Sequence, residues 1–550
     1  MTADLVVRGG TVVDGTGSPG RRADVAVTDG KIVEVAEKVD GKRVVDASGQ
    51  VVAPGFIDIH THYDAQVFWD PALTPSCWHG VTTVISGNCG FSLAPCRPEH
   101  RGLMARTLEH VEGMSLEALD AGIRWDFETF PEYLDAVGRE HPMLNFGAFI
   151  GHTPLRLWVM GDEGYERAAT DQEISAMRAV VAEAVAAGAM GFATSSAPTH
   201  QGDGGRPVPS RKAELEEVEA LAGAVGDVGK GVVQILPGEK VRLRDIYALQ
   251  PRVKRPFTWT ALLTVPNGQH RKAVERNRTA RAEGVNVWPQ MAVRPLTFIF
   301  HLAEPFTFDT VPIFAELHGV GRDERLRRYA DPDWRARAQD ALDHGPIPAR
   351  WNNLLIAETE TRSELVGRTV GEVAAEQGVR PLDLMCELAL TEDLRTRFKG
   401  VMANNEPEFV AELLNEDGLI IGLSDAGAHA SQLCDACFST DLLGQYVRER
   451  KAIALEDAVR KLTGELADAF GIEGRGYLRQ GAAADIVVFD PDTVSPGPIH
   501  RVYDFPAGAD RLLADRPIGI THVVVNGTVI REGGEPVAVD QRPGQVVRST

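Results

Sequence analysis

Short apolar runs and longer helical stretches alternate along the middle of the chain, from Gly55 to about residue 475. Such alternation is typical of βα units that share a parallel sheet. Eight strands with their helices would close a (β/α)8 TIM-like barrel, so the expected fold class is α/β. The strand candidates are Phe56 to His60, Val81 to Ser86, Asn145 to Gly151, Gly188 to Thr194, Gly231 to Leu236, Phe257 to Leu263, Val285 to Trp288, Lys399 to Ala403 and Leu419 to Ser424.

A helix start is clearest at Thr170, which is followed by Glu173 at the spacing of a capping box. Apolar residues then recur at helical spacing, which predicts one buried face. These residues are Ile174, Met177, Val180, Val181 and Ala184.

The two ends of the chain alternate with period two instead, and turn signals such as Asp29-Gly30 separate the runs. Residues 4 to 46 cannot close a sheet alone, and residues 484 to 530 show the same period-two alternation. We therefore predict one small β-sandwich built from both termini, with parts at residues 1–53 and 476–550. The barrel would occupy residues 54–475, and its stretch at about 291–397 would be an insertion, either a lid or a packing element.

Composition excludes several classes of protein. The chain has 550 residues, 43% hydrophobic and 25% charged, with a formal charge of −21. Binding to nucleic acid or an anionic membrane needs clustered Lys and Arg, so a small-molecule substrate is expected. No secretory signal or apolar membrane span is present, which predicts a cytoplasmic protein, with a homo-oligomer left open. Six cysteines do not suggest a disulfide framework, and Cys434-x-x-Cys437 is interpreted as two ordinary thiols.

Two histidines, His60 and His62, follow the apolar run Phe56 to Ile59. Residues two positions apart on a strand point to the same face. Two neutral imidazoles fixed in this way can grip a zinc-like ion and leave positions for water and substrate. Such pairs also occur by chance on strand surfaces, but here Thr61 and Asp64 are placed to orient the imidazoles.

The segment Pro54 to His62 reads PGFIDIHTH and resembles the amidohydrolase superfamily, whose first barrel strand ends in this pattern. The segment Gly87 to Gly90, GNCG, resembles the D-aminoacylase branch, also called N-acyl-D-amino-acid deacylases. The resemblance implies that Cys89 ligates zinc, although a lone cysteine is more often a small buried hydrophobe. It also implies that Asp425 touches the metal and moves the proton, whereas an aspartate beside glycines can simply cap a helix.

Candidates for substrate binding follow the third and fourth strand candidates. His152 ends the third, in a stretch that matches the deacylase pattern, and a glycine-rich loop with His200 and Arg211 follows the fourth. Arg211 could pair with a substrate carboxylate through two hydrogen bonds, and His200 could join it. The alternative is that both residues only fix the loop.

The resemblance weakens at the fifth and sixth strand candidates, Gly231 to Leu236 and Phe257 to Leu263. Family members contribute a metal-binding histidine from each, and this chain has none there. The remaining donors are His60, His62, Cys89 and Asp425. These donors suffice for one Zn2+ ion, and a second ion is not expected.

The leading hypothesis is metal-dependent hydrolysis of a linear amide, most simply an N-acyl (D-)amino acid, with Asp425 as general base and acid. One alternative is hydrolysis of a cyclic amide or related C–N bond in the same barrel. Another is a barrel with reduced catalysis that serves as an assembly subunit or small-molecule binder.

Overall fold

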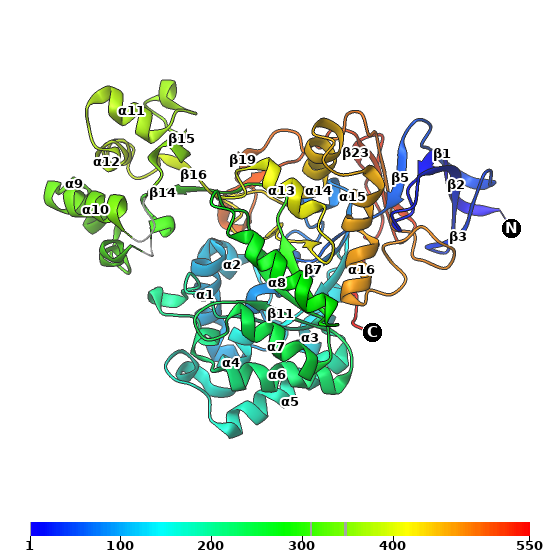
Figure 1. The fold of residues 1–550 in the computed structure, drawn as a ribbon, viewed down its shortest axis with the longest axis horizontal. Coiled ribbons are helices and arrows are strands. Elements are labelled where there is room, and N and C mark those ends of the chain that lie inside the picture. Colours follow the sequence, from blue (N-terminus) through cyan, green and yellow to red (C-terminus); the bar gives the residue numbers. More distant parts are fainter. Residues whose placement is uncertain (1, 309–310, 346–348) are drawn as a thin grey trace.

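Parallel strands form the centre of the molecule (Figure 1). The computed structural model describes residues 2–308, 311–345 and 349–550. The central strands form two sheets, in the orders β6-β7-β8 and β9-β10-β11-β12-β13-β17. A parallel bridge between Thr61 and Ala426 links the segments that follow β6 and β17. Their bounds are β6 Phe56–Asp58, β7 Val81–Ser86, β8 Asn145–Ala148, β9 Ile150–Gly151, β10 Gly191–Ser195, β11 Val232–Leu236, β12 Phe257–Leu262, β13 Val287–Met291 and β17 Ile420–Ile421.

Helices lie between these strands along the chain and pack around them (Figure 1). In α5, the Thr170 side chain accepts from the Glu173 backbone and Glu173 reaches back, which confirms the predicted capping box. Met177, Val181 and Ala184 are buried on its inner face. The helices are α1 Arg101–Glu112, α2 Leu116–Gly122, α3 Phe130–Arg139, α4 His152–Met160, α5 Asp171–Ala187, α6 Leu215–Val228, α7 Leu243–Val253, α8 His270–Ala282, α13 Pro407–Leu414, α14 Phe438–Asp441, α15 Leu455–Leu462 and α16 Gly464–Phe470.

Strands from both ends of the chain form one sheet, in the order β23-β22-β21-β18-β5-β1-β2-β3, with β4 paired to β1. The junction between the two ends is antiparallel pairing of β5 with β18, where Val52 faces Val488. Both valines are buried in a core shared by the N-terminal and C-terminal strands. The bounds are β1 Ala3–Val12, β2 Arg21–Thr28, β3 Lys31–Ala36, β4 Gly41–Asp46, β5 Val51–Pro54, β18 Ile486–Phe489, β21 Ile520–Val525, β22 Thr528–Glu532 and β23 Glu535–Pro536.

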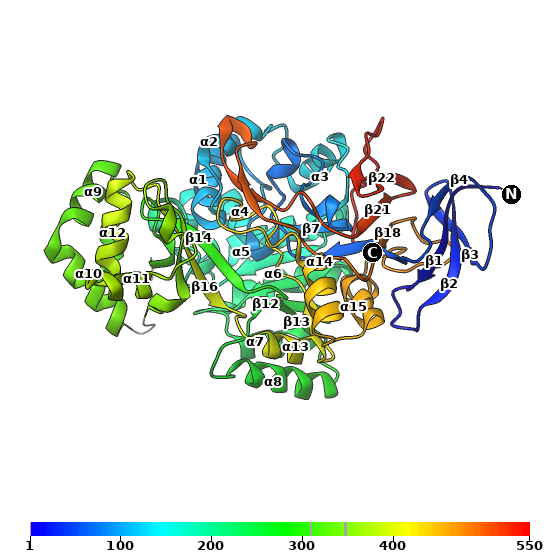
Figure 2. The ribbon, with the colours of Figure 1, turned by 90° about the horizontal axis from the view of Figure 1, so that it is seen from above.

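A segment between β13 and β17 projects from the main body, at the end opposite β1 to β4 in two views (Figures 1 and 2). It has its own core, which includes Phe300, Trp334 and Leu342. Its sheet runs in the order β14-β16-β15 and is antiparallel. The bounds are β14 Leu296–His301, α9 Arg322–Ala330, α10 Pro332–His344, β15 Leu354–Glu358, α11 Val370–Gln377, α12 Pro381–Thr391 and β16 Arg397–Ala403.

The expectation that Lys399 to Ala403 is a strand of the parallel core is wrong. These residues belong to β16, which pairs antiparallel with β14 and β15 inside the projecting segment. A short run with one half-buried face predicts a strand but does not reveal which neighbours it pairs with. Residues that follow β18 reach this segment through a hairpin of β19, His500–Val502, and β20, Arg511–Leu513. There Arg501 pairs with Glu358 of β15 at 2.8 Å.

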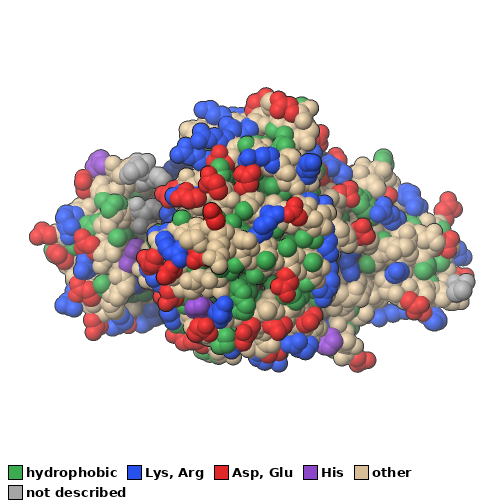
Figure 3. All heavy atoms as spheres, turned by 90° about the horizontal axis from the view of Figure 1, so that it is seen from below, with side chains coloured by type: hydrophobic (Ala, Val, Ile, Leu, Met, Phe, Trp, Pro, Cys, Tyr) green, Lys and Arg blue, Asp and Glu red, His purple; other side chains and the backbone are tan. Residues whose placement is uncertain are grey.

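Acidic and basic side chains are interspersed over the face shown in Figure 3. None of the helices in the described residues is long and apolar enough to cross a membrane.

Candidate metal centre

His60 and His62 lie in the segment directly after β6, and both side chains are buried. The strand ends at Asp58, two residues before the predicted end. The backbone is fixed by the segment after β17, since the Ser424 hydroxyl donates to the His60 carbonyl at 3.1 Å. The His62 N–H donates to the Ala426 carbonyl at 2.7 Å. The two imidazoles therefore have little freedom to separate.

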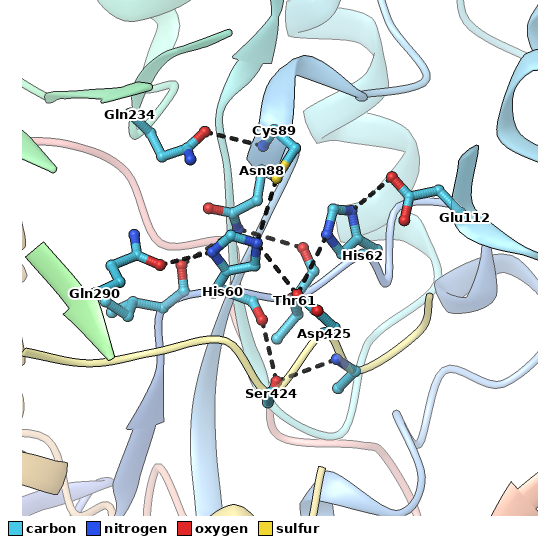
Figure 4. A network of polar contacts seen from close by, with 12 residues as sticks. His60, Thr61, His62, Asn88, Cys89, Glu112, Gln234, Gln290, Ser424 and Asp425 are labelled. Carbon is cyan, nitrogen blue, oxygen red and sulfur yellow. Dashed lines mark hydrogen bonds and ion pairs between the residues drawn. The ribbon is translucent and has the colours of Figure 1, made fainter. Parts of the chain in front are cut away.

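Cys89 and Asp425 lie beside these imidazoles (Figure 4). The Cys89 Sγ atom lies 3.6 Å from His60 Nε2. Asp425 Oδ1 lies 3.3 Å from His60 Nε2 and 3.8 Å from His62 Nε2. One ligand atom each from His60, His62 and Cys89 lie within 4.8 Å of one another. Four donors of the kinds that zinc prefers thus converge from three separate segments.

Both Cys89 and Asp425 adopt left-handed backbone conformations, with φ of 55° and 46°. Non-glycine residues rarely adopt this region, and strain of about 1–3 kcal/mol there is typical of functional sites. The turn that carries Cys89, Asn88–Gly90, is held by Asn88, whose Nδ2 donates to the carbonyls of Ile59 and Ile85. The surrounding hydrogen bonds therefore maintain a conformation that aims the thiol at His60.

Gln290 of β13 determines which ring nitrogen of His60 carries the proton. Its Oε1 atom lies 2.6 Å from His60 Nδ1, while its Nε2 donates to the Thr258 hydroxyl at 3.1 Å. Because the amide oxygen can only accept, His60 Nδ1 carries the proton. The lone pair is then on Nε2, the atom that faces Cys89 and Asp425.

Glu112, the last residue of α1, is a second buried partner. Its Oε1 atom lies 3.2 Å from His62 Nδ1. On the other side of the centre, Gln234 of β11 accepts a hydrogen bond from the Cys89 backbone N–H at 2.9 Å.

Sequence reasoning missed Glu112, Gln234 and Gln290. For the two glutamines the available signal was a polar residue within an apolar strand, whereas nothing near Glu112 in the sequence marks it.

Burial dominates the electrostatics of the centre. It lowers the pKa of His60 to about 4, so the imidazole is neutral at neutral pH. It raises the pKa of Asp425 to about 6. Burial and the negative charges of Asp425 and Glu112 also raise the pKa of the Cys89 thiol well above its usual value.

The carboxyl of Glu112 behaves like the Cys89 thiol. Burial, followed by the charges of Asp425 and Asp64, raises its pKa well above the usual value. Acidic groups packed together without water disfavour one another's charged forms. A divalent cation among them would reverse these shifts and stabilise the thiolate and carboxylates. The donor set and its electrostatics therefore fit a zinc ion.

His200 lies near the metal centre, whereas both ring nitrogens of His152 are hydrogen-bonded to residues outside it. His200 Nδ1 lies 2.7 Å from the Ser195 hydroxyl, and its ring packs against Phe91. Burial, followed by the positive charges of the nearby His429, Arg211 and His60, lowers its pKa to about 3. His152 is fully buried, with Nδ1 2.8 Å from the Thr194 hydroxyl and Nε2 2.9 Å from Glu217 Oε1.

Arg211 holds the loop that carries His200. Its Nη1 donates to the carbonyls of Pro198 at 3.0 Å and His200 at 3.3 Å. Its Nη2 pairs with Glu239 at 3.1 Å. Among the residues that the structure describes, its buried Nε has no hydrogen-bond partner.

Comparison with known proteins identifies the family. The model of the Amidohydrolase family matches residues 43–531. The chain belongs to this family. It is 32% identical to a D-aminoacylase of Alcaligenes xylosoxydans xylosoxydans, over 100% of this chain and 98% of the relative. It is 30% identical to an N-acyl-D-aspartate deacylase of the same organism, over 99% of this chain and 95% of the relative. The resemblance drawn from the sequence is confirmed.

A solved structure extends the comparison to a metal. The chain resembles an N-acyl-D-glutamate deacylase from Bordetella bronchiseptica, with a TM-score of 0.69 and 27% identity over 100% of both chains. That protein was crystallised with zinc and a phosphonate that mimics the tetrahedral intermediate of its reaction. Family membership and this relative agree with the fit of the donor set to zinc.

Proposed function

We propose that the protein hydrolyses the amide bond of an N-acyl-D-amino acid, and that His60, His62, Cys89 and Asp425 hold the metal it needs. The observation that carries this proposal is the convergence of the four donors, with the lone pair of His60 Nε2 turned to Cys89 and Asp425. The names of the relatives support the choice of substrate, since they act on N-acyl-D-amino acids.

Zinc at this centre would supply a Lewis acid that lowers the pKa of bound water and polarises a carbonyl. The proton transfers fall to Asp425, whose carboxylate accepts a proton from the attacking water and then delivers it to the leaving nitrogen. Burial raises the pKa of Asp425 to about 6, and a bound cation would lower it, so the carboxylate would be ionised and able to accept a proton at neutral pH. Gln290 and Glu112 would orient the two imidazoles.

We expect one zinc ion. The family resemblance implies a metal-binding histidine from each of the fifth and sixth strands, whereas β11 and β12 contain none. These strands direct Gln234 and Thr258 to the same face in adjacent register. Neither an amide nitrogen nor a neutral hydroxyl is a good zinc ligand. This donor set supports a single-ion enzyme.

Substrate contacts are proposed for His200 and the loop behind it. Protonation of His60 would lower the pKa of His200, so the two imidazoles are near one another, which supports a direct contact between His200 and substrate. Arg211 and His152 are already engaged by Glu239 and Glu217. We therefore propose that Arg211 holds the loop in place and that His152 stabilises the strand ends behind it.

The architecture is proposed to be a closed (β/α)8 barrel at residues 54–475 with a β-sandwich from residues 1–53 and 476–550. The strand order and the bridge from Thr61 to Ala426 support closure. Pairing of β5 with β18 supports the sandwich. The segment at about 291–397 touches the centre's neighbourhood, since the Ile299 N–H donates to the Gln432 carbonyl at 2.8 Å. This contact is consistent with a lid.

A substrate panel tests the proposed function. Purified protein loaded with zinc would be assayed for free amine release from N-acetyl-D-amino acids, with N-acetyl-L-amino acids and hydantoins as comparison substrates. We expect turnover of at least one D-substrate and its loss in Asp425→Asn. Turnover restricted to cyclic substrates, or none on the whole panel, would contradict the proposal.

A further inference from the structure

Strands β11, β12 and β13 direct a row of uncharged polar side chains toward His60. Gln234 of β11 is in register with Thr258 of β12, and Thr258 accepts a hydrogen bond from Gln290 of β13 at 3.1 Å. Gln234, Thr258 and Gln290 are all buried. Buried polar groups are normally paired, so each member of this row should have partners for its donors and acceptors.

Gln290 meets this expectation. Its oxygen accepts from His60 and its nitrogen donates to Thr258. The Thr258 hydroxyl in turn donates to the Trp288 carbonyl at 2.7 Å. Gln290 therefore acts on the centre only through His60.

Gln234 differs from Gln290 at its nitrogen. The Cys89 backbone N–H is a donor, so the Gln234 atom that it contacts must be the oxygen. This contact removes the ambiguity of the amide and assigns the other end as Nε2. Among the described residues, that nitrogen is buried and has no hydrogen-bond partner. Leaving a buried donor unpaired destabilises the protein, and a bound acceptor would remove this cost.

The free nitrogen lies beside the metal centre. Gln234 is anchored to the backbone of Cys89, whose thiol lies 3.6 Å from His60 Nε2. In the view of Figure 4, its nitrogen is turned away from Cys89 toward the space beside His60 and Gln290. An amide N–H is a donor and not a metal ligand, so its natural partner is an oxygen atom of a bound molecule.

We propose that Gln234 is a catalytic residue that donates from Nε2 to the oxygen of the scissile carbonyl. The inference rests on the proposed amide hydrolysis. As the water oxygen bonds to the carbonyl carbon, the π electrons move onto the carbonyl oxygen and the water proton moves to Asp425. The electron pair on that oxygen then re-forms the carbonyl as the C–N bond breaks, and the pair of the C–N bond leaves with the nitrogen, which takes the proton from Asp425. A fixed donor at the oxygen stabilises the charge that develops in the first step.

Two substitutions separate this role from simple support of Cys89. Gln234→Glu keeps an oxygen for the Cys89 N–H and removes the donor, while Gln234→Met removes both. Assays at about pH 10 keep the new carboxyl ionised, because even fully buried glutamates have a pKa of about 8–9. We expect both variants to lose about 10²- to 10³-fold in kcat with KM little changed. Their affinity for a phosphonate analogue of the substrate should fall by a similar factor, while zinc content stays at the wild-type level.

Gln250→Met is the matched control. Gln250 is a buried glutamine of α7 that accepts from Asn286 N–H and donates to the Arg255 carbonyl. Arg255 comes just before β12 and Asn286 just before β13, so both partners lie at the starts of these strands, whereas the metal centre lies at the other end of the sheet. We expect this variant to lower Tm and keep wild-type kcat.

Three results would overturn the inference. Wild-type kcat in Gln234→Glu but not in Gln234→Met would reduce Gln234 to an anchor for Cys89. Loss of zinc in both variants would make it a support of the metal site. Absence of turnover by the wild-type protein on every N-acyl amino acid would overturn the proposed function and this inference together. The first two results concern only the variants, so they overturn the inference and leave the proposed function standing.

Discussion

The Nδ1 atom of His60 lies 2.6 Å from the Oε1 atom of Gln290, and this contact sets the tautomer of a proposed metal ligand. Partners of this kind typically affect metal affinity by 10- to 100-fold. Replacing Gln290 with Leu should therefore weaken zinc binding by about that factor, as measured by competition with a chromogenic chelator. Gln290→Glu, which keeps an acceptor at the same place, should bind zinc more tightly than Gln290→Leu. Equal affinity of the leucine variant and the wild type would show that the contact does not control the ligand.

The pair His60 and His62 should be required for metal but not for folding. In a (β/α)8 barrel, the proposed architecture, the ends of the strands carry function more than stability. In the double variant His60→Ala/His62→Ala we expect zinc content near background, measured by elemental analysis, and a wild-type circular dichroism spectrum. His344→Ala, at a histidine with a side chain 76% exposed, is the control and should keep its zinc. Unchanged zinc in the double variant would place the metal elsewhere.

Sequence reasoning worked best where the chemistry is local. The spacing of His60 and His62 and the position of Asp425 after an apolar run are visible in short windows, and the structure brings their side chains together. Glu112 reaches His62 from the end of a helix 50 residues later, and no local pattern encodes that approach. Lys399 to Ala403 shows the same limit, because strand propensity does not specify pairing partners.

Glu392 should make the projecting segment sensitive to acid. Burial would raise its pKa, but hydrogen bonds from Thr359, Thr396 and Thr361 outweigh burial and lower it to about 2. Because the folded pKa lies below the unfolded value of about 4.3, this carboxylate stabilises the fold above about pH 4.3. The contribution is lost as the pH falls toward 2.

Amide exchange at Thr361, whose N–H donates to Glu392 at 2.8 Å, would report this loss. As the pH falls below about 4.3, protection of this amide from exchange should decline more steeply in the wild type than in Glu392→Gln, after correction for intrinsic exchange. Glu376→Gln, at a side chain 62% exposed, should behave like the wild type. Identical pH profiles for wild type and Glu392→Gln would contradict the assignment.

The pairing of β5 with β18 predicts that the two ends of the chain depend on each other. Deleting residues 476–550 removes β18 and leaves the hydrogen-bonding edge of β5 unpaired. Exposed apolar strand edges promote aggregation, so we expect the truncated protein to be insoluble when expressed. Recovery of a soluble and active truncation would show that the N-terminal strands are stable alone.

Asp425 provides the test that separates proton transfer from metal binding. Its Oδ1 atom lies 3.3 Å from His60 Nε2, so the side chain is placed to contact both the proposed ligands and a water bound between them and the substrate. Asp425→Asn keeps the size of the side chain and one oxygen, but the amide cannot accept a proton at neutral pH. Loss of a general base or acid typically lowers the rate by about 10²- to 10⁴-fold. We therefore expect the variant to keep most of its zinc, which elemental analysis would measure, and to lose turnover on the N-acyl amino acid that the wild type accepts. Asp435→Asn is the comparison, because Asp435 is also buried but pairs with Arg294 at 2.7 Å. We expect Asp435→Asn to lower Tm and to keep kcat near the wild-type value. Wild-type turnover in Asp425→Asn would assign the proton transfers to another group, and Glu112 beside His62 would be the next to replace.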